Sequence, residues 1–261
     1  MSGDTIVFAG PSVAGMEFEP PAHFRFLPPC KQGDVYLASL QKPAVIAIID
    51  GFFDGVPSVW HKEILWALSQ GIHVLGASSM GALRAAETHS FGMKGVGIVF
   101  DGFRTGDLED DDEVALLHGP PEMDFMPLSV AMVNVRATLA AALEHDAISP
   151  ALAERILTIA KSQFYRKRTW ASIISECKRT PGANDLTEDQ ASWLSKNEVD
   201  QKQQDALALC NILLSSDFST PFEATFEFEE TEFWHRHTRI WTKAMGQSLP
   251  DRDPGDVRLF T

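Results

Sequence analysis

One stretch decides the fold of this chain: it runs from Gly76 to Glu87 and reads Gly-Ala-Ser-Ser-Met-Gly-Ala-Leu-Arg-Ala-Ala-Glu. The preceding run 73–77 is short and apolar, which predicts a buried strand. The run 80–89 is rich in Ala and Leu and has no Gly or Pro after Gly81, which predicts a helix. Ser78 and Ser79 therefore lie at the entrance of a helix that follows a strand.

These two serines have two interpretations. In the first, the pattern from Ala77 to Gly81 forms a nucleophile elbow, because small neighbours allow the tight turn that presents a serine oxygen above the sheet edge. Free N–H groups of the first helical turn then face that oxygen. In the second, Ser78 or Ser79 simply caps the helix, since serine is a preferred N-cap residue. The stretch by itself leaves both interpretations open.

Working outward, the N-terminal half predicts alternating strands and helices. Runs 5–9 and 43–49 predict buried strands, the second of which is apolar on both faces and stops at Asp50-Gly51. A helix is predicted over 59–70, and residues 16–34 predict an irregular or short crossover segment. This order indicates an α/β fold with a parallel sheet, which binds ligands beyond the carboxyl ends of its strands. Asp50 and Ser79 both lie at such ends.

The remainder of the chain is mainly helical in character. After a predicted strand over 96–100, the pattern predicts helices over 130–144, from Pro150, near 170–178 and from 188 toward 216. Alternating phenylalanines predict an edge strand over 222–228, and 231–245 is weakly helical. We therefore expect an α/β core domain over 1–120 that carries the site, with a mostly helical C-terminal region over 121–261 packed on it.

The composition of the chain indicates which partners it can bind and in which cellular compartment it works. The chain has 261 residues, 44% of them hydrophobic, and a net charge of −14, so nucleic acids and anionic membranes would be repelled. The three cysteines form no C-x-x-C pair, and the chain lacks a signal-peptide pattern and any apolar run of spanning length. These features predict a cytoplasmic protein of one or two domains with neither nucleic-acid nor membrane partners.

No motif for a bound cofactor or metal is present in the sequence. The spacing of Gly92, Gly95 and Gly97 does not fit a dinucleotide fingerprint, and there is no P-loop. Six of the seven residues from Asp107 to Glu113 are acidic, but no histidine or regular ligand spacing accompanies them. That segment therefore predicts a solvated loop, and we expect no cofactor and no metal.

A serine nucleophile also needs a base within hydrogen-bond reach. His61 and Lys62, at the start of the preceding helix, are both candidates. A Ser-His pair needs an orienting carboxylate such as Asp50, whereas a Ser-Lys pair needs a neutral lysine whose pKa is lowered by burial. Trp66 lies one turn beyond Lys62 and the helix N-terminus disfavours a cation, so these two observations favour lysine. Spacing alone does not choose between them.

Five uncommon strings, over roughly residues 5–118, occur in the order typical of one family. They are Ile48-Ile49-Asp50-Gly51-Phe52-Phe53, Pro57-Ser58-Val59-Trp60-His61-Lys62-Glu63-Ile64-Leu65, the stretch from Gly76 to Glu87, Phe91-Gly92-Met93-Lys94-Gly95-Val96-Gly97 and Asp111-Asp112-Glu113-Val114-Ala115. In these strings the chain resembles the TfuA family.

The resemblance implies a role in peptide-backbone thioamidation. Members of the family act beside YcaO enzymes, which use ATP to activate a backbone amide so that sulfur replaces its oxygen. They hydrolyse the C-terminal thiocarboxylate of a ThiS-like, ubiquitin-fold sulfur carrier, which releases sulfide, and they assist YcaO. The family's Ser-Lys pair maps onto Ser79 and Lys62 of this sequence. ATP is then the partner's cofactor, and this chain is expected to bind none.

Several further residues follow as hypotheses from that mechanism. The N–H of Met80 and a second donor from the Gly51 or Gly10 loop would hold the oxyanion, and Ser78 is either the nucleophile itself or a support. Arg84 or His61 would offset the charge of the ionised thioacid. A competing class is a non-catalytic adaptor, in which the loop of Asp110, Asp111, Asp112 and Glu113 docks YcaO or the carrier. A general serine peptidase or esterase is a third class.

Overall fold

The computed structural model describes residues 4–179 and 186–245, and its centre is a parallel five-stranded sheet. The strands stand in the order β2-β1-β3-β4-β5. Their bounds are β1 Thr5–Phe8, β2 Phe24–Leu27, β3 Val45–Ile48, β4 His73–Ala77 and β5 Lys94–Val96. The predicted α/β class and the predicted strands at 5–9, 43–49 and 73–77 are therefore confirmed.

Helices make up most of the rest of the described chain. In the N-terminal half they are α1 Asp34–Ser39, α2 His61–Ser69, α3 Met80–Thr88 and α4 Ile98–Thr105. They continue with α5 Met132–Glu144, α6 Pro150–Ser162, α7 Trp170–Arg179, α8 Glu188–Lys196, α9 Gln201–Ser215 and α10 Glu232–Met245. Two predicted helix starts are confirmed by their capping hydrogen bonds. The Ser149 hydroxyl accepts a hydrogen bond from the N–H of Leu152, and Thr187 forms a capping box with Gln190.

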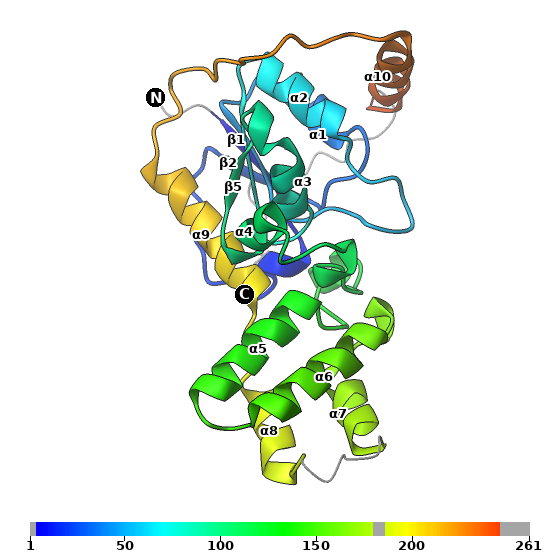
Figure 1. Cartoon of the computed structure of the whole chain (residues 1–261). Coiled ribbons are helices and arrows are strands. Elements are labelled where there is room, and N and C mark those ends of the chain that lie inside the picture. The colour runs from blue at the N-terminus through cyan, green and yellow to red at the C-terminus, as the bar shows by residue number, and fades with distance from the viewer. Residues whose placement is uncertain (1–3, 180–185, 246–261) are drawn as a thin grey trace.

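Helices cover both faces of the sheet (Figure 1). Alternate strand residues such as Ile46 and Val74 face α1, α2 and α3 in one buried cluster. The residues between them, such as Ala47 and Leu75, face α9 and pack against its Leu209. The buried strands are therefore apolar on both faces because a helix from the far end of the sequence covers the second one.

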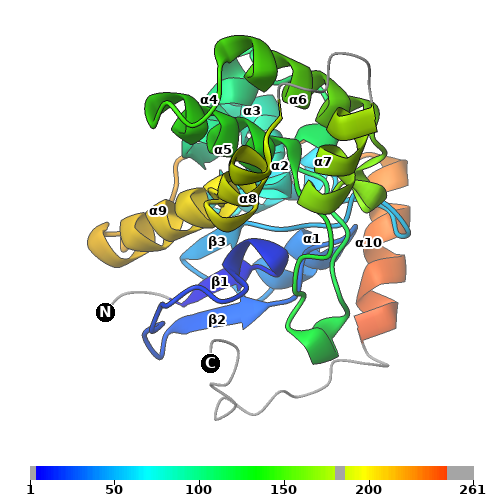
Figure 2. The same cartoon turned by 90° about the horizontal axis from the view of Figure 1, so that it is seen from below.

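The helices after residue 121 divide between two places. α5, α6, α7 and α8 form a separate buried cluster, and they lie together beyond the end of the sheet (Figures 1 and 2). α9 instead packs on the sheet, and α10 packs on α1 through Trp234 and Tyr36, whose rings are 5.4 Å apart. Two helices of the C-terminal half therefore pack on the N-terminal α/β part: α9 covers one face of the sheet, and α10 covers α1.

Three predicted segments differ from the structure. The strand predicted over 96–100 is wrong, because β5 ends at Val96 and α4 begins at Ile98. Gly97 turns the chain with φ 95°, and Asp205 of α9 accepts hydrogen bonds from the N–H groups of Ile98 and Val99. The edge strand expected over 222–228 does not form. Phe222 and Phe226 pack on the buried cluster below the sheet helices, and Phe228 contacts Trp66 and Trp234. Within 16–34, the edge strand β2 was missed.

Two glycines let α3 approach the sheet closely. A Cβ on Gly81 would lie 1.7 Å from the carbonyl oxygen of Ile48, and a Cβ on Gly76 would lie 2.1 Å from the carbonyl oxygen of Gly81. Neither distance can be accommodated by a shift of a side chain, because the neighbouring atoms are backbone. The stretch from Gly76 to Glu87 thus carries the small residues that its own packing requires.

Candidate functional site

The serine turn between β4 and α3 is strained. Ser78 has φ 71°, in the left-handed region that L-residues avoid, and the N–H of Ser79 donates to the carbonyl oxygen of Ala77 at 2.8 Å. A hydrogen bond from residue i+2 back to residue i, with positive φ between them, is the rare form of γ-turn. The sharp turn predicted after the strand is confirmed, and the strain falls on Ser78. Such strain often marks a functional site.

Neither serine side chain caps α3. Ser79 occupies the N-cap position, yet its hydroxyl makes no capping hydrogen bond, and we find no other partner for it within residues 4–179 and 186–245. The Ser78 hydroxyl donates instead to the carbonyl oxygen of Lys202 at 2.7 Å. The capping interpretation is therefore wrong for both residues, and Ser79 is the serine whose hydroxyl is left unengaged.

Asp50 lies at the point where the strand order reverses, between the ends of β1 and β3. Its Oδ2 accepts hydrogen bonds from the N–H groups of Gly10 and Ser12 at 2.9 and 3.0 Å, and its Oδ1 accepts from the Ser12 hydroxyl at 2.6 Å. Asp50 is 1% exposed. Open sheets of this strand order bind ligands at such a switch point. Asp50 and Gly10, both predicted as site residues from the sequence, are therefore in direct contact.

Lys202, in the first turn of α9, completes this cluster. It is 1% exposed, its Nζ donates to the carbonyl oxygen of Val114 at 2.9 Å, and Nζ lies 3.9 Å from Asp50 Oδ1. Burial lowers the pKa of Lys202, and the negative charges of Asp50 and Asp200 oppose that shift. Sequence reasoning missed Lys202 because nothing near it in the chain marks it. It also missed Ser12, although the loop position directly after a parallel strand was a usable signal.

Lys62 points toward the C-terminal segment. Its Nζ donates to the Thr231 hydroxyl at 3.4 Å and lies 5.2 Å from the centroid of the Phe228 ring, which also contacts Trp66. The apolar surroundings expected from Trp66 are present. In the described part of the chain, no hydrogen bond joins Lys62 to Ser79.

The two predicted charge-offsetting cations share one carboxylate. His61 Nε2 lies 2.8 Å from Glu87 Oε2, and Arg84 Nη1 lies 2.6 Å from the same oxygen. Arg84 Nε also donates to the carbonyl oxygen of Val59 at 3.0 Å. The side chains of His61 and Arg84 are therefore both engaged with Glu87 beside α3.

The predicted oxyanion donors do not all remain available. Met80 is the first residue of α3, so its N–H has no partner four residues back within the helix. Gly51 packs directly on it, since a Cβ on Gly51 would lie 2.7 Å from Met80 Cγ. The N–H of Gly10, by contrast, already donates to Asp50. Met80 and Gly51 are brought together, and the Gly10 donor is occupied.

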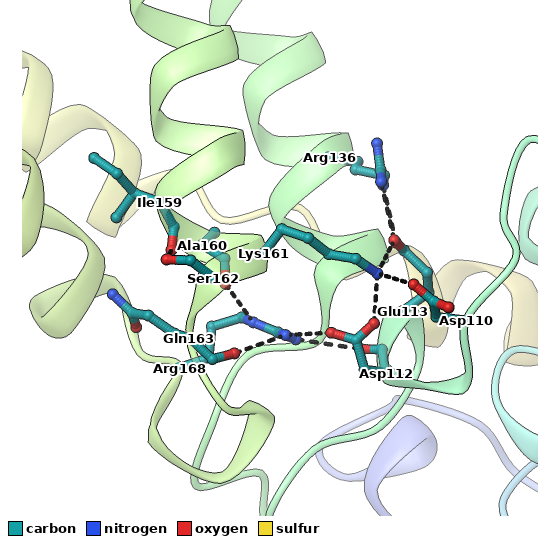
Figure 3. A network of polar contacts seen from close by, with 10 residues as sticks. All are labelled: Asp110, Asp112, Glu113, Arg136, Ile159, Ala160, Lys161, Ser162, Gln163 and Arg168. Carbon is teal, nitrogen blue, oxygen red and sulfur yellow. Dashed lines mark hydrogen bonds and ion pairs between the residues drawn. The ribbon is translucent and has the colours of Figure 1, made fainter.

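The acidic segment forms a clamp with the helices rather than a free loop (Figure 3). Lys161 of α6 pairs with Asp110, Asp112 and Glu113, and Arg136 of α5 makes a bidentate contact with Glu113. Burial alone would raise the pKa of Asp112, but hydrogen bonds from Lys161 and the buried Arg168 outweigh it and lower that pKa. Asp111 is exposed.

Comparison with known proteins bears on the segment that carries the serine turn. Residues 50–169 match the family model described as TfuA-like protein. The chain contains a TfuA-like domain. The match confirms the resemblance to the TfuA family, and it begins at Asp50 and extends through the acidic clamp. Ser12 and Lys202 lie outside the matched residues, so the buried cluster around Asp50 includes residues from both flanks of the TfuA-like domain. The chain matches no curated protein.

Within residues 4–179 and 186–245, we find no group of three or more His, Cys, Asp or Glu side chains placed to hold a metal ion. None of the helices in those ranges is both long enough and apolar enough to cross a membrane.

Proposed function

We propose that this TfuA-like protein hydrolyses the C-terminal thiocarboxylate of a ThiS-like sulfur carrier and so supplies sulfide to a YcaO enzyme. The TfuA family is associated with YcaO-dependent systems, and the family match supports that context. The observation that carries the hydrolytic part is the serine turn. It combines positive φ at Ser78, an unengaged Ser79 hydroxyl and the N-terminus of α3 at the carboxyl edge of a central strand.

In the proposed reaction, Ser79 is the nucleophile and Lys62 the base. Lys62 takes the hydroxyl proton as Ser79 Oγ attacks the thioacid carbon, and the N–H of Met80 stabilises the oxyanion. The proton passes to the departing sulfur, the C–S bond breaks and hydrosulfide leaves an acyl-serine. Water then cleaves the ester, which returns Ser79 and a carrier that ends in a carboxylate. This route requires Lys62 to exchange its contact with Thr231 for one with Ser79.

The test compares sulfide release from thiocarboxylated carrier by wild type, Ser79→Ala and Lys62→Ala. We expect Ser79→Ala to fall to the background rate and Lys62→Ala to lose about 10²–10⁴-fold, the usual contribution of a positioned base. Ser215→Ala and Lys178→Ala are matched controls, because both residues lie on exposed helix surface. Ser78→Ala, assayed in parallel, decides which of the two serines is the nucleophile.

Full sulfide release by both variants would leave the adaptor function as the better account. In that case, pull-down of YcaO and of the carrier by the same variants should be unaffected. Turnover of unrelated activated esters, independent of the carrier's fold, would instead indicate a general esterase or peptidase. YcaO binding that survives the loss of sulfide release would show that hydrolysis and partner assistance are separable.

A further inference from the structure

The buried Lys202 ammonium has donors that the protein does not use. An ammonium carries three N–H donors, and that of Lys202 makes one hydrogen bond, to the carbonyl oxygen of Val114 at 2.9 Å. Its nearest carboxylate oxygen, Asp50 Oδ1, lies 3.9 Å away, which is outside hydrogen-bond range. Within the described ranges we find no other partner for Nζ. The N–H donors of buried polar groups normally make hydrogen bonds. The two remaining donors of Lys202 therefore indicate that an acceptor binds there.

Asp50 does not supply that acceptor because its nearer oxygen, Oδ1, lies 3.9 Å from Nζ, and other donors hold the carboxylate in place. Oδ2 accepts from Gly10 and Ser12, and Oδ1 accepts the short hydrogen bond from the Ser12 hydroxyl. These contacts hold the carboxylate on the β1 side of the switch point. The Lys202 charge is therefore only partly compensated, and it lies at low dielectric, where an additional anion would interact strongly with it.

The position of Lys202 relates it to the serine turn. Its own carbonyl oxygen accepts the hydroxyl of Ser78, the residue directly before Ser79. Near α3, the side chains of His61 and Arg84 share the carboxylate of Glu87. Lys202 thus differs from Arg84 in that its ammonium has no carboxylate oxygen within hydrogen-bond range in the described part of the chain.

We propose that Lys202 binds the negatively charged terminus of an extended peptide tail, the thiocarboxylate before cleavage and the carboxylate after it. This inference rests on the proposed function and deepens it. An ionised thioacid is a poor electrophile, and a buried ammonium beside it stabilises the further negative charge that develops as serine attacks. Asp50, held by Gly10 and Ser12, is then a positioning residue whose negative charge keeps the Lys202 ammonium at this end of the sheet.

Access to Lys202 requires neighbouring segments to move. Lys202, Asp50, Ser78 and Ser79 are all at most 2% exposed. Phe125, itself buried, packs at Gly10, where a Cβ would lie 3.4 Å from its ring. Binding is therefore best measured at equilibrium, where the cost of opening is the same for every ligand that carries the same tail.

The experiment compares two forms of one ThiS-like carrier, ending in a carboxylate or in a carboxamide. We expect wild type to bind the carboxylate form at least about tenfold more tightly, the value of one hydrogen bond to a charged group. Lys202→Met should lose this preference and Lys202→Arg should retain part of it. Lys178→Met is the matched control, because it removes an exposed lysine of α7 that pairs with Glu188 and should keep the preference. Thermal unfolding checks that each variant is folded.

The outcomes separate this inference from the proposed function. Equal affinity of wild type for the two forms, or no binding of either, would overturn the role of Lys202 whatever the sulfide assay shows. A carboxylate preference that depends on Lys202, without sulfide release by wild type, would sustain the anion site and remove the hydrolase. A neutral methyl thioester of the carrier adds a kinetic test. Lys202→Met should slow thiocarboxylate cleavage far more than thioester cleavage, and an equal loss on both substrates would contradict charge compensation.

Discussion

At the scale of the residue, Ser78 shows how the serine turn is held. Its backbone stays at φ 71° while its hydroxyl donates to the carbonyl oxygen of Lys202 at 2.7 Å. The left-handed conformation costs an L-residue about 1–2 kcal/mol, which the surrounding packing must supply. Glycine would be less strained than serine at position 78. The presence of serine there therefore indicates that its hydroxyl is needed, for structure or for catalysis.

We expect Ser78→Gly to be more stable than Ser78→Ala. Both variants lose the hydrogen bond to Lys202, but only glycine removes the strain. The difference should be about 1 kcal/mol, which is the left-handed penalty less the extra entropy of glycine in the unfolded chain. Urea unfolding measures it.

Ser195 is the matched control for this pair of substitutions. It lies within α8, and its hydroxyl likewise donates to a backbone carbonyl, that of Ala191 at 3.0 Å. Its backbone is helical, so Ser195→Gly should be less stable than Ser195→Ala by about 1 kcal/mol. The same order at both positions would mean that strain does not determine the stability of the serine turn.

At the scale of the element, α10 is attached through aromatic rings. Trp234 is 1% exposed, and its ring lies 5.4 Å from Tyr36 of α1 and 5.8 Å from Trp66 of α2. Thr231, just before α10, holds Lys62. The position of the proposed base is therefore coupled to the attachment of a helix that lies outside the matched family segment.

Trp234→Ala should detach α10 without unfolding the sheet. Removal of a buried tryptophan costs about 3–5 kcal/mol, which is enough to open a single helix that packs at the periphery. Hydrogen exchange should accelerate over 232–245 and stay unchanged over 45–48 and 73–77. Phe233→Ala, at a 60% exposed neighbour, should change neither segment. Equal acceleration in the sheet would show that α10 belongs to the global folding unit.

At the scale of the whole molecule, the acidic clamp joins the α/β part to the helical cluster. Asp112 Oδ2 accepts a hydrogen bond from Arg168 Nη2 at 2.6 Å, and the Arg168 side chain is fully buried. Arg168 also donates to the carbonyl oxygens of Ala160 and Gln163, so the guanidinium fixes the end of α6. A cluster that appears in the sequence as a solvated acidic run is thus a connection between two hydrophobic cores.

Asp112→Ala should destabilise the protein by about 2–3 kcal/mol, because it leaves a buried guanidinium without its carboxylate. The value is below that of a fully buried pair, since the Asp112 side chain is 29% exposed. The pKa of Asp112 is lowered, so its contribution is fully present above the unfolded value and is lost as the pH falls through the folded one. Urea unfolding between pH 7 and acidic pH measures both effects.

Asp111 provides the control for the clamp, because it is the same residue type one position earlier and is exposed. Asp111→Ala should change stability by no more than about 0.5 kcal/mol. Comparable losses from the two substitutions would indicate that the net acidity of the segment matters rather than the contact with Arg168.

Local patterns in the sequence determined much of the fold. The strands at 45–48 and 73–77, the helix from Pro150 and the sharp serine turn follow from apolar runs, caps and small residues, whose effects act between near neighbours in the chain. Errors arose where a distant residue intervened, as when Asp205 capped α4 at a segment read as a strand. Local propensity carries no information about such a partner.

The sequence alone therefore determined the α/β class and the position of the serine turn, because neighbouring residues set both. Only the tertiary structure decided which side chains surround that turn. Lys202 meets Asp50 and Ser78 because α9 packs across the second face of the sheet, and Lys62 meets Thr231 because α10 packs on α1 and α2. These contacts depend on how buried faces pair over long separations, and no short-range pattern encodes that pairing.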